Sequence, residues 1–281
     1  MLFKVFSLFL VIQFASFALW QGVQAWNKND LKPVSAVEEA VEEPVKPIVV
    51  DDQVIREPDL GHVRFAARDE KAGYRIVDTE KKEEIVTVLK KLPEYHTKTL
   101  KNLILDYNPD AHRGLGGKSM IILRAVNMDS EEFFGVMIHE IGHNVDLGAL
   151  SETDEEVVSE FKDDKKPIYE SDPSLGFYRI SWQNEQKRKN EASNLDFVSG
   201  YAMTDPFEDF AETYVYYVLH NKDFKSKTQT SEALLKKYQF MKNEVFRSQE
   251  FDTGEYLTDK LSSRPWDITV LNYDLDHFLS L

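Results

Sequence analysis

An apolar segment in the middle of the chain carries two histidines and a glutamate: Val136-Met137-Ile138-His139-Glu140-Ile141-Gly142-His143. Residues four apart share one face of a helix, so His139 and His143 can bind a single metal ion. Glu140 would then lie beside the metal, where a carboxylate can take a proton from a bound water. Ionisable groups in so apolar a segment would be costly without a partner. The segment therefore predicts a metal centre that activates water.

A tetrahedral zinc with two histidine ligands needs one more protein ligand, with water in the open position. The chain has no cysteine, so this ligand is a histidine or a carboxylate. Ala149 stands where a metzincin would have its third histidine, six residues after the second one. Asp146, three residues on, is better placed to orient an imidazole or to end the helix. Glu208 and Glu212 remain as candidates.

Both glutamates lie on a second predicted helix. Asp205 is a good N-cap, Pro206 suits the first helical position, and the apolar pattern continues to about His220. Two carboxylates on a core helix call for partners, which favours a glutamate ligand. Two other interpretations stay open, because Asp205 and Glu208 also fit a capping box and Glu212 could form a surface ion pair.

The two motifs together resemble the catalytic domain of anthrax lethal factor and the related secreted Pro-Pro endopeptidases, which are gluzincins. That family has His-Glu-x-x-His-x-x-Asp, and later a tyrosine seven residues before the ligand glutamate. Here Asp146 follows His143 by three residues, and Tyr201 precedes Glu208 by seven. The resemblance covers roughly residues 100–220 and is specific in the two motifs but weak between them.

The resemblance implies a role for each residue that matches these motifs. It implies three zinc ligands: His139, His143 and Glu208. It also implies that Glu140 is the general base and that Tyr201 stabilises the oxyanion. Glu212 would contact one of the ligands without binding the zinc itself. A phenol can donate such a hydrogen bond to a tetrahedral oxyanion. Tyr201 is also one of twelve tyrosines, so an ordinary structural role is the alternative.

The fold predicted for residues 61–281 is a single α+β domain, zincin-like, with a small sheet, the helix of about 130–146 and a C-terminal helical part. The best strand candidate is 119–123, an apolar run rich in branched residues. In zincins the strand before the metal-binding helix forms the edge of the cleft, although 118–123 could equally be an internal strand. A further strand is expected at 178–182 and further helices at 230–247.

The N-terminus predicts export. Residues 1–25 have the apolar core of a signal peptide and end in Val23-Gln24-Ala25, with small residues at the −3 and −1 positions. An uncleaved membrane anchor is the alternative, although the apolar stretch is short for a bilayer. Residues 26–60 are expected to form a flexible acidic linker rich in Pro, Glu and Val.

The net charge of −15 argues against nucleic acid as a partner. The sequence predicts a secreted or periplasmic zinc endopeptidase with one zinc per chain and a peptide or protein substrate. It would use a zinc-bound water activated by Glu140. One alternative is a catalytically inactive zincin-fold module that binds a cell-envelope or protein partner. A purely structural zinc is disfavoured, since such sites have four protein ligands, commonly cysteines. The oligomeric state stays open.

Overall fold

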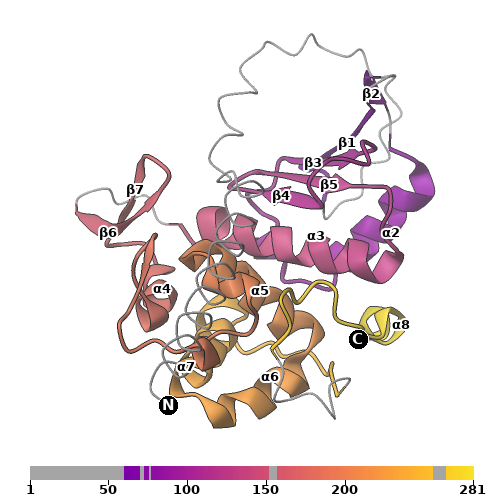
Figure 1. Cartoon of the computed structure of the whole chain (residues 1–281). Helices are drawn as coiled ribbons and strands as arrows, with labels where there is room; N and C mark the ends of the chain where they lie inside the picture. Colours follow the sequence, from indigo (N-terminus) through magenta and orange to yellow (C-terminus); the bar gives the residue numbers. More distant parts are fainter. Residues whose placement is uncertain (1–59, 70–72, 76, 152–156, 256–263) are drawn as a thin grey trace, which may run out of the picture. The chain divides into compact units, whose positions relative to one another are not determined.

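The computed structural model describes residues 60–69, 73–75, 77–151, 157–255 and 264–281, all within the second of two units, Asp52–Leu281. These residues form a mixed α/β domain with small sheets and several helices (Figure 1). The predicted signal peptide, and all but the last residue of the predicted linker, lie outside the described residues. Among the described helices, none is both long and apolar enough to cross a bilayer.

The main sheet has five strands in the order β2-β1-β3-β5-β4. Their bounds are β1 Arg64–Asp69, β2 Gly73–Arg75, β3 Asn102–Asp106, β4 Gly114–Gly116 and β5 Met120–Arg124. β1, β3 and β5 are parallel, and β2 and β4 are antiparallel edge strands. Of the two alternatives left open for 118–123, the structure shows the internal strand: β5 lies between β3 and β4, as its apolar sequence suits, and β4 is at the edge.

Helix α3 (Ser130–Asn144) confirms the helix predicted from about residue 130 to 146. The Asp129 carboxylate accepts a hydrogen bond from the Glu132 amide at 2.8 Å and caps the first turn. One π-helical turn, Val145–Ala149, continues the helix past its predicted end. Figure 1 shows α3 between the main sheet and the C-terminal helices, and it contacts β4 and β5 on one side and α5 on the other. This position explains why residues 133–144 are all buried.

Helix α5 (Pro206–Leu219) is the second predicted helix. The Asp205 carboxylate accepts from the amides of Phe207 and Glu208, both at 2.9 Å. One turn in, Asp209 forms a fully buried ion pair with Lys237, 2.6 Å from Nζ to Oδ2. The Trp182 indole donates to the same oxygen at 2.9 Å. The bonds of Asp209 therefore connect the beginning of α5 to Lys237 and Trp182.

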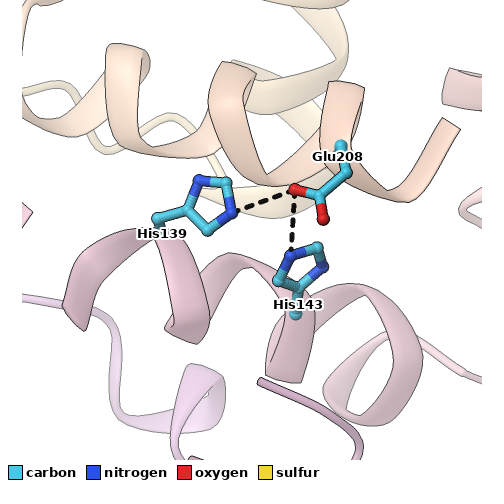
Figure 2. A group of neighbouring side chains, drawn as sticks. All are labelled: His139, His143 and Glu208. Atoms are coloured by element: carbon cyan, nitrogen blue, oxygen red, sulfur yellow. Dashed lines mark hydrogen bonds and ion pairs between the residues drawn. The ribbon is translucent and has the colours of Figure 1, made fainter. Parts of the chain in front are cut away.

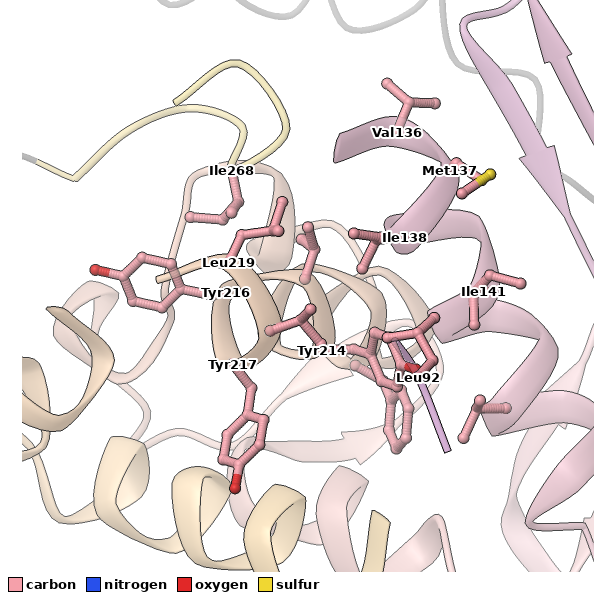
Figure 3. Close-up of a cluster of buried hydrophobic side chains, with 14 of the residues drawn as sticks. Leu92, Val136, Met137, Ile138, Ile141, Tyr214, Tyr216, Tyr217, Leu219 and Ile268 are labelled. Atoms are coloured by element: carbon pink, nitrogen blue, oxygen red, sulfur yellow. The ribbon is translucent and has the colours of Figure 1, made fainter. Parts of the chain in front are cut away.

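A hydrophobic core lies between α3 and α5, on the side of α3 that faces away from the main sheet. Figure 3 shows Ile138 and Ile141 of α3 opposite Tyr214 and Leu219 of α5. All four side chains are at most 1% exposed. Ile268, from the C-terminal segment, lies in the same cluster and is also buried. The C-terminal segment is therefore packed into the core that carries the two motifs.

The other α-helices of the described residues are α2 (Thr79–Leu89), α4 (Leu175–Ser181), α6 (Asn221–Lys227), α7 (Glu232–Phe240) and α8 (Leu275–Ser280). Two hairpins pair β6 (Val158–Asp163) with β7 (Lys166–Tyr169), and β8 (Trp182–Asn184) with β9 (Lys187–Arg188). Helix α7 and the π-helical turn Met241–Val245 confirm the helical prediction for 230–247.

The strand predicted at 178–182 is wrong, because α4 occupies all but its last residue. The five residues alternate between apolar and polar, which suggested a strand. Leu175, Tyr178 and Ser181 are buried, and their spacing of three places them on one helical face. An alternation over only five residues is too short to distinguish the pattern of a strand from that of a helix.

Gly142 allows α3 and α5 to approach each other closely. A Cβ at this position would lie 3.0 Å from Cα of Ala211 and 3.2 Å from Cβ of Tyr214. Gly142→Ala is therefore expected to lower the free energy of unfolding by about 1–3 kcal/mol, as overpacking does, although alanine usually stabilises a helix. Urea denaturation measures the change. Gly117→Ala, where a Cβ meets no atom within 4 Å, is the control. An equal effect of the two substitutions would contradict this explanation.

Candidate metal centre

Three side chains from α3 and α5 converge in the interior of the domain. Nε2 of His139 lies 3.1 Å, and Nε2 of His143 3.4 Å, from Oε2 of Glu208 (Figure 2). One ligand atom from each residue lies within 4.8 Å of the other two. All three residues are buried. Two nitrogens and one oxygen in this arrangement match the donors of a His-His-Glu zinc site.

The two helices determine which atoms meet. His139 and His143 are one turn apart on α3, with ring centroids 4.9 Å apart. Glu208 lies in the first turn of α5, where the Asp205 cap fixes the backbone. Its carboxylate points at the histidines of α3 (Figure 2). The predicted ligands are thus brought together by the packing of α3 on α5.

The hydrogen-bonding pattern of His139 supports a cation at this point. Its Nδ1 donates to Oε1 of Glu212 at 3.0 Å, while Nε2 faces Oε2 of Glu208. A neutral imidazole carries one N–H, so only an imidazolium could donate to both carboxylates. A cation held between Nε2 and Oε2 would satisfy the same geometry with a neutral ring. The residues therefore fit a bound metal ion.

The pKa values of His139 and Glu208 also indicate that the cluster favours a positive charge at this point. Burial lowers the pKa of His139, but hydrogen bonds to Glu208 and Glu212 outweigh it and raise the pKa well above its ordinary value. Burial raises the pKa of Glu208, but the charges and hydrogen bonds of the two histidines outweigh it and lower the pKa. The pocket thus favours an ionised glutamate beside positive charge, which is what a metal ion supplies.

Glu212 lies one turn beyond Glu208 and contacts the back of His139. Its Oε1 accepts from Nδ1 of His139, and its Oε2 accepts from the backbone amide of Ile268 at 2.9 Å. Both carboxylate oxygens are thereby used, and the side chain is fully buried. A carboxylate in this position fixes the tautomer and the orientation of the imidazole.

Glu140 lies on the side of α3 that faces the edge strand β4. A Cβ at Gly114 would lie 2.7 Å from its Cδ, and one at Gly116 would lie 2.5 Å from its Oε2. The two glycines therefore make room for this carboxylate against the sheet. Burial raises the pKa of Glu140 from its ordinary value, although the histidines oppose this. A raised pKa suits a carboxylate that takes up and releases a proton.

Tyr201 reaches the cluster from a short 3₁₀ turn, Tyr201–Met203, which precedes α5 and is called the Tyr201 turn below. Its hydroxyl donates to Oε1 of Glu208 at 3.0 Å, and its ring is stacked near His139 with the centroids 6.1 Å apart. Burial raises the pKa of Tyr201 from its ordinary value, and the charge of Glu208 adds to this. The phenol is therefore held as a neutral hydrogen-bond donor beside the candidate ligands.

Asp146 lies in the π-helical turn that follows α3. Its Oδ2 accepts from the Tyr178 hydroxyl at 2.7 Å, and burial raises its pKa to about 8. Among the described contacts of Asp146 there is no hydrogen bond to His143. The suggestion that Asp146 orients a histidine therefore stays a prediction.

Two features near the centre were not predicted from the sequence. The Asn144 amide donates to the carbonyls of Gly117 and Lys118 at 3.1 and 2.7 Å, which joins the β4–β5 turn to α3. The segment 265–269 reaches both the Tyr201 turn and Glu212. Asn144 directly follows the histidine motif, which is only a weak indication in the sequence that it belongs to the site. The sequence of the C-terminal segment gives no such indication.

Residues 125–270 match the model of a family described as "putative zinc-binding metallo-peptidase". The match covers more than half of the chain and includes α3, α5 and the segment 265–269. The chain therefore belongs to this family of zinc-binding metallopeptidases. No curated protein and no solved structure matches the chain.

Proposed function

We propose that this protein is a zinc-dependent endopeptidase of the gluzincin type. The observation that carries the proposal is the convergence of His139, His143 and Glu208, with Glu140 buried beside them. The family match supports zinc binding and peptidase chemistry in general. In the proposed assignment the three residues hold one zinc ion, and Glu212 holds His139 in position.

A zinc ion bound there would polarise the scissile carbonyl and lower the pKa of a coordinated water to about 7. Glu140 takes the proton from the attacking water and delivers it to the leaving amine. Its burial supports this role, since a carboxylate in an apolar setting binds a proton more readily than one in water. The pocket of Gly114 and Gly116 restricts where the carboxylate can move.

Tyr201 is proposed to stabilise the oxyanion that forms as the carbonyl is attacked. Its hydroxyl donates to Oε1 of Glu208, a proposed zinc ligand, which supports this role because the phenol is held as a donor beside the proposed metal position. The edge strand β4 is proposed to pair with an extended substrate, because no other strand of the described residues pairs with its outer side. The substrate would then lie next to Glu140.

A non-catalytic binding module is the less favoured function. Such a module needs no general base, whereas here a glutamate is buried next to the candidate ligands. The export of the protein is also a proposal, supported by the N-terminal sequence alone.

The purified protein should cleave a peptide library and yield internal fragments. A strong chelator should abolish cleavage, and about one equivalent of zinc per chain should restore it. Mass spectrometry of the products identifies the bonds that are cut. Cleavage that survives complete removal of the metal would contradict the proposal, as would a zinc-loaded protein that cleaves nothing.

A further inference from the structure

An exposed tryptophan lies close to the candidate metal centre. Trp266 is 63% exposed, the largest exposed fraction among the large apolar side chains of the described residues. A tryptophan left in water forgoes the stabilisation that burial of its large apolar surface provides. An indole in such a position is a common anchor for binding, since aromatic side chains concentrate at binding hot spots.

The backbone on both sides of Trp266 is fixed to the site. The Pro265 carbonyl accepts from the Gly200 amide at 2.9 Å, and the Trp266 carbonyl accepts from the Tyr201 amide at 2.6 Å. Two residues further on, the amide of Ile268 donates to Glu212. The backbone of Trp266 is thus held by hydrogen bonds, while more than half of its side chain surface stays exposed to solvent.

The neighbouring residues strengthen this support. Asp267 and Thr269 are buried, and Oδ1 of Asp267 accepts from the Thr269 amide at 2.7 Å. The guanidinium of Arg113, just before β4, contacts Asp267 and donates to Oγ1 of Thr269 at 3.1 Å. The segment therefore connects the start of the edge strand to the Tyr201 turn.

The position of Gly200 places the indole beside the turn that carries Tyr201. A Cβ at Gly200 would lie 2.5 Å from Cε3 and 3.0 Å from Cζ3 of Trp266. The indole therefore lies directly against the residue that precedes Tyr201, whose hydroxyl contacts Glu208. A peptide whose scissile bond lies at Glu140 and Tyr201 would bring a neighbouring side chain to the exposed part of this ring.

We infer that Trp266 is a specificity-determining residue that contacts a large apolar or aromatic side chain next to the scissile bond; this inference rests on the proposed peptidase function. An indole on a fixed backbone loses little conformational freedom on binding, which favours such contacts. The substrate class is therefore a peptide with a bulky apolar residue beside the cleaved bond.

Cleavage profiling of a peptide library by the full-length protein tests this inference. Wild type should prefer bulky apolar residues at one position next to the cut. Trp266→Ala should lower kcat/KM for those peptides about 10-fold, mainly through KM, and should flatten the preference at that position only. Trp266→Phe should keep most of the preference. Val270→Ala, which removes an exposed side chain just after the other end of the segment, should leave the profile unchanged.

A profile that Trp266→Ala leaves unchanged would overturn the inference while leaving the proposed function intact. An equal fall in kcat for all peptides would also overturn it, because that would indicate a positioning role. Binding gives a readout that does not depend on cleavage. Fluorescein-labelled Ala-Ala-Phe-Leu-Ala-Ala should bind the Glu140→Gln variant about 10-fold more tightly than hexa-alanine does.

The added substitution Trp266→Ala should abolish that difference in fluorescence anisotropy titrations. A difference that persists would overturn the inference. If wild type cleaves no peptide at all, the proposed function fails, and the binding measurement alone still supports or overturns the role of Trp266.

Discussion

Replacing Glu140 with glutamine is expected to lower kcat/KM for peptide hydrolysis by at least about 100-fold and to leave the zinc content unchanged. Glutamine has nearly the same shape as glutamate, so it fits the pocket of Gly114 and Gly116, but it cannot accept the proton of the attacking water. Because Glu140 is not among the three convergent ligands, its loss should not release the metal. Metal analysis and initial-rate kinetics on the same preparation measure both effects.

Glu131→Gln is the matched control for this substitution. Glu131 lies on the same helix, in its exposed first turn, so removing its charge should change neither zinc content nor rate by more than about twofold. Normal turnover by Glu140→Gln would show that the water is activated by another group. Loss of zinc from Glu140→Gln would instead place Glu140 among the ligands.

Glu208→Ala and Glu212→Ala are expected to differ strongly in zinc affinity. Removing Glu208 leaves two histidine ligands, so most of the zinc should be lost. Removing Glu212 leaves all three ligands but frees Nδ1 of His139, which should weaken binding by roughly 10- to 100-fold. Competition with a chromophoric chelator measures both dissociation constants.

The comparison also requires a check that both variants fold, since both glutamates are buried. Circular dichroism and thermal unfolding of the metal-free forms provide it. Equal zinc affinity in the two variants, or a larger loss for Glu212→Ala, would contradict the assignment of Glu208 as ligand.

The two helices that carry the site were predictable because their signals are local. Asp129 and Asp205 are N-caps that act within three residues, and each precedes an apolar pattern with helical spacing. The edge strand had no such signal, because Gly114–Gly116 is too short to show an alternation. Its pairing with β5 depends on the turn between them, which Asn144 holds from α3.

The relative roles of Glu208 and Glu212 could not be read from spacing alone. They lie one turn apart on the same face of α5, so either could meet the histidines. The packing of α3 on α5, which Gly142 permits, places Glu208 at the Nε2 atoms and Glu212 at Nδ1 of His139. The role proposed for Trp266 could not be predicted from the sequence for a similar reason, since its position depends on backbone hydrogen bonds to residues more than sixty positions away.

Anomalous diffraction at the zinc edge, from crystals of the zinc-loaded protein, tests the central claim most directly. We expect one anomalous peak per chain, bound by Nε2 of His139, Nε2 of His143 and a carboxylate oxygen of Glu208. The nitrogen and oxygen distances should be about 2.0–2.2 Å. A peak bound by Glu212 or Asp146, with Glu208 turned away from the metal, would contradict the account, as would a peak at any other place in the chain.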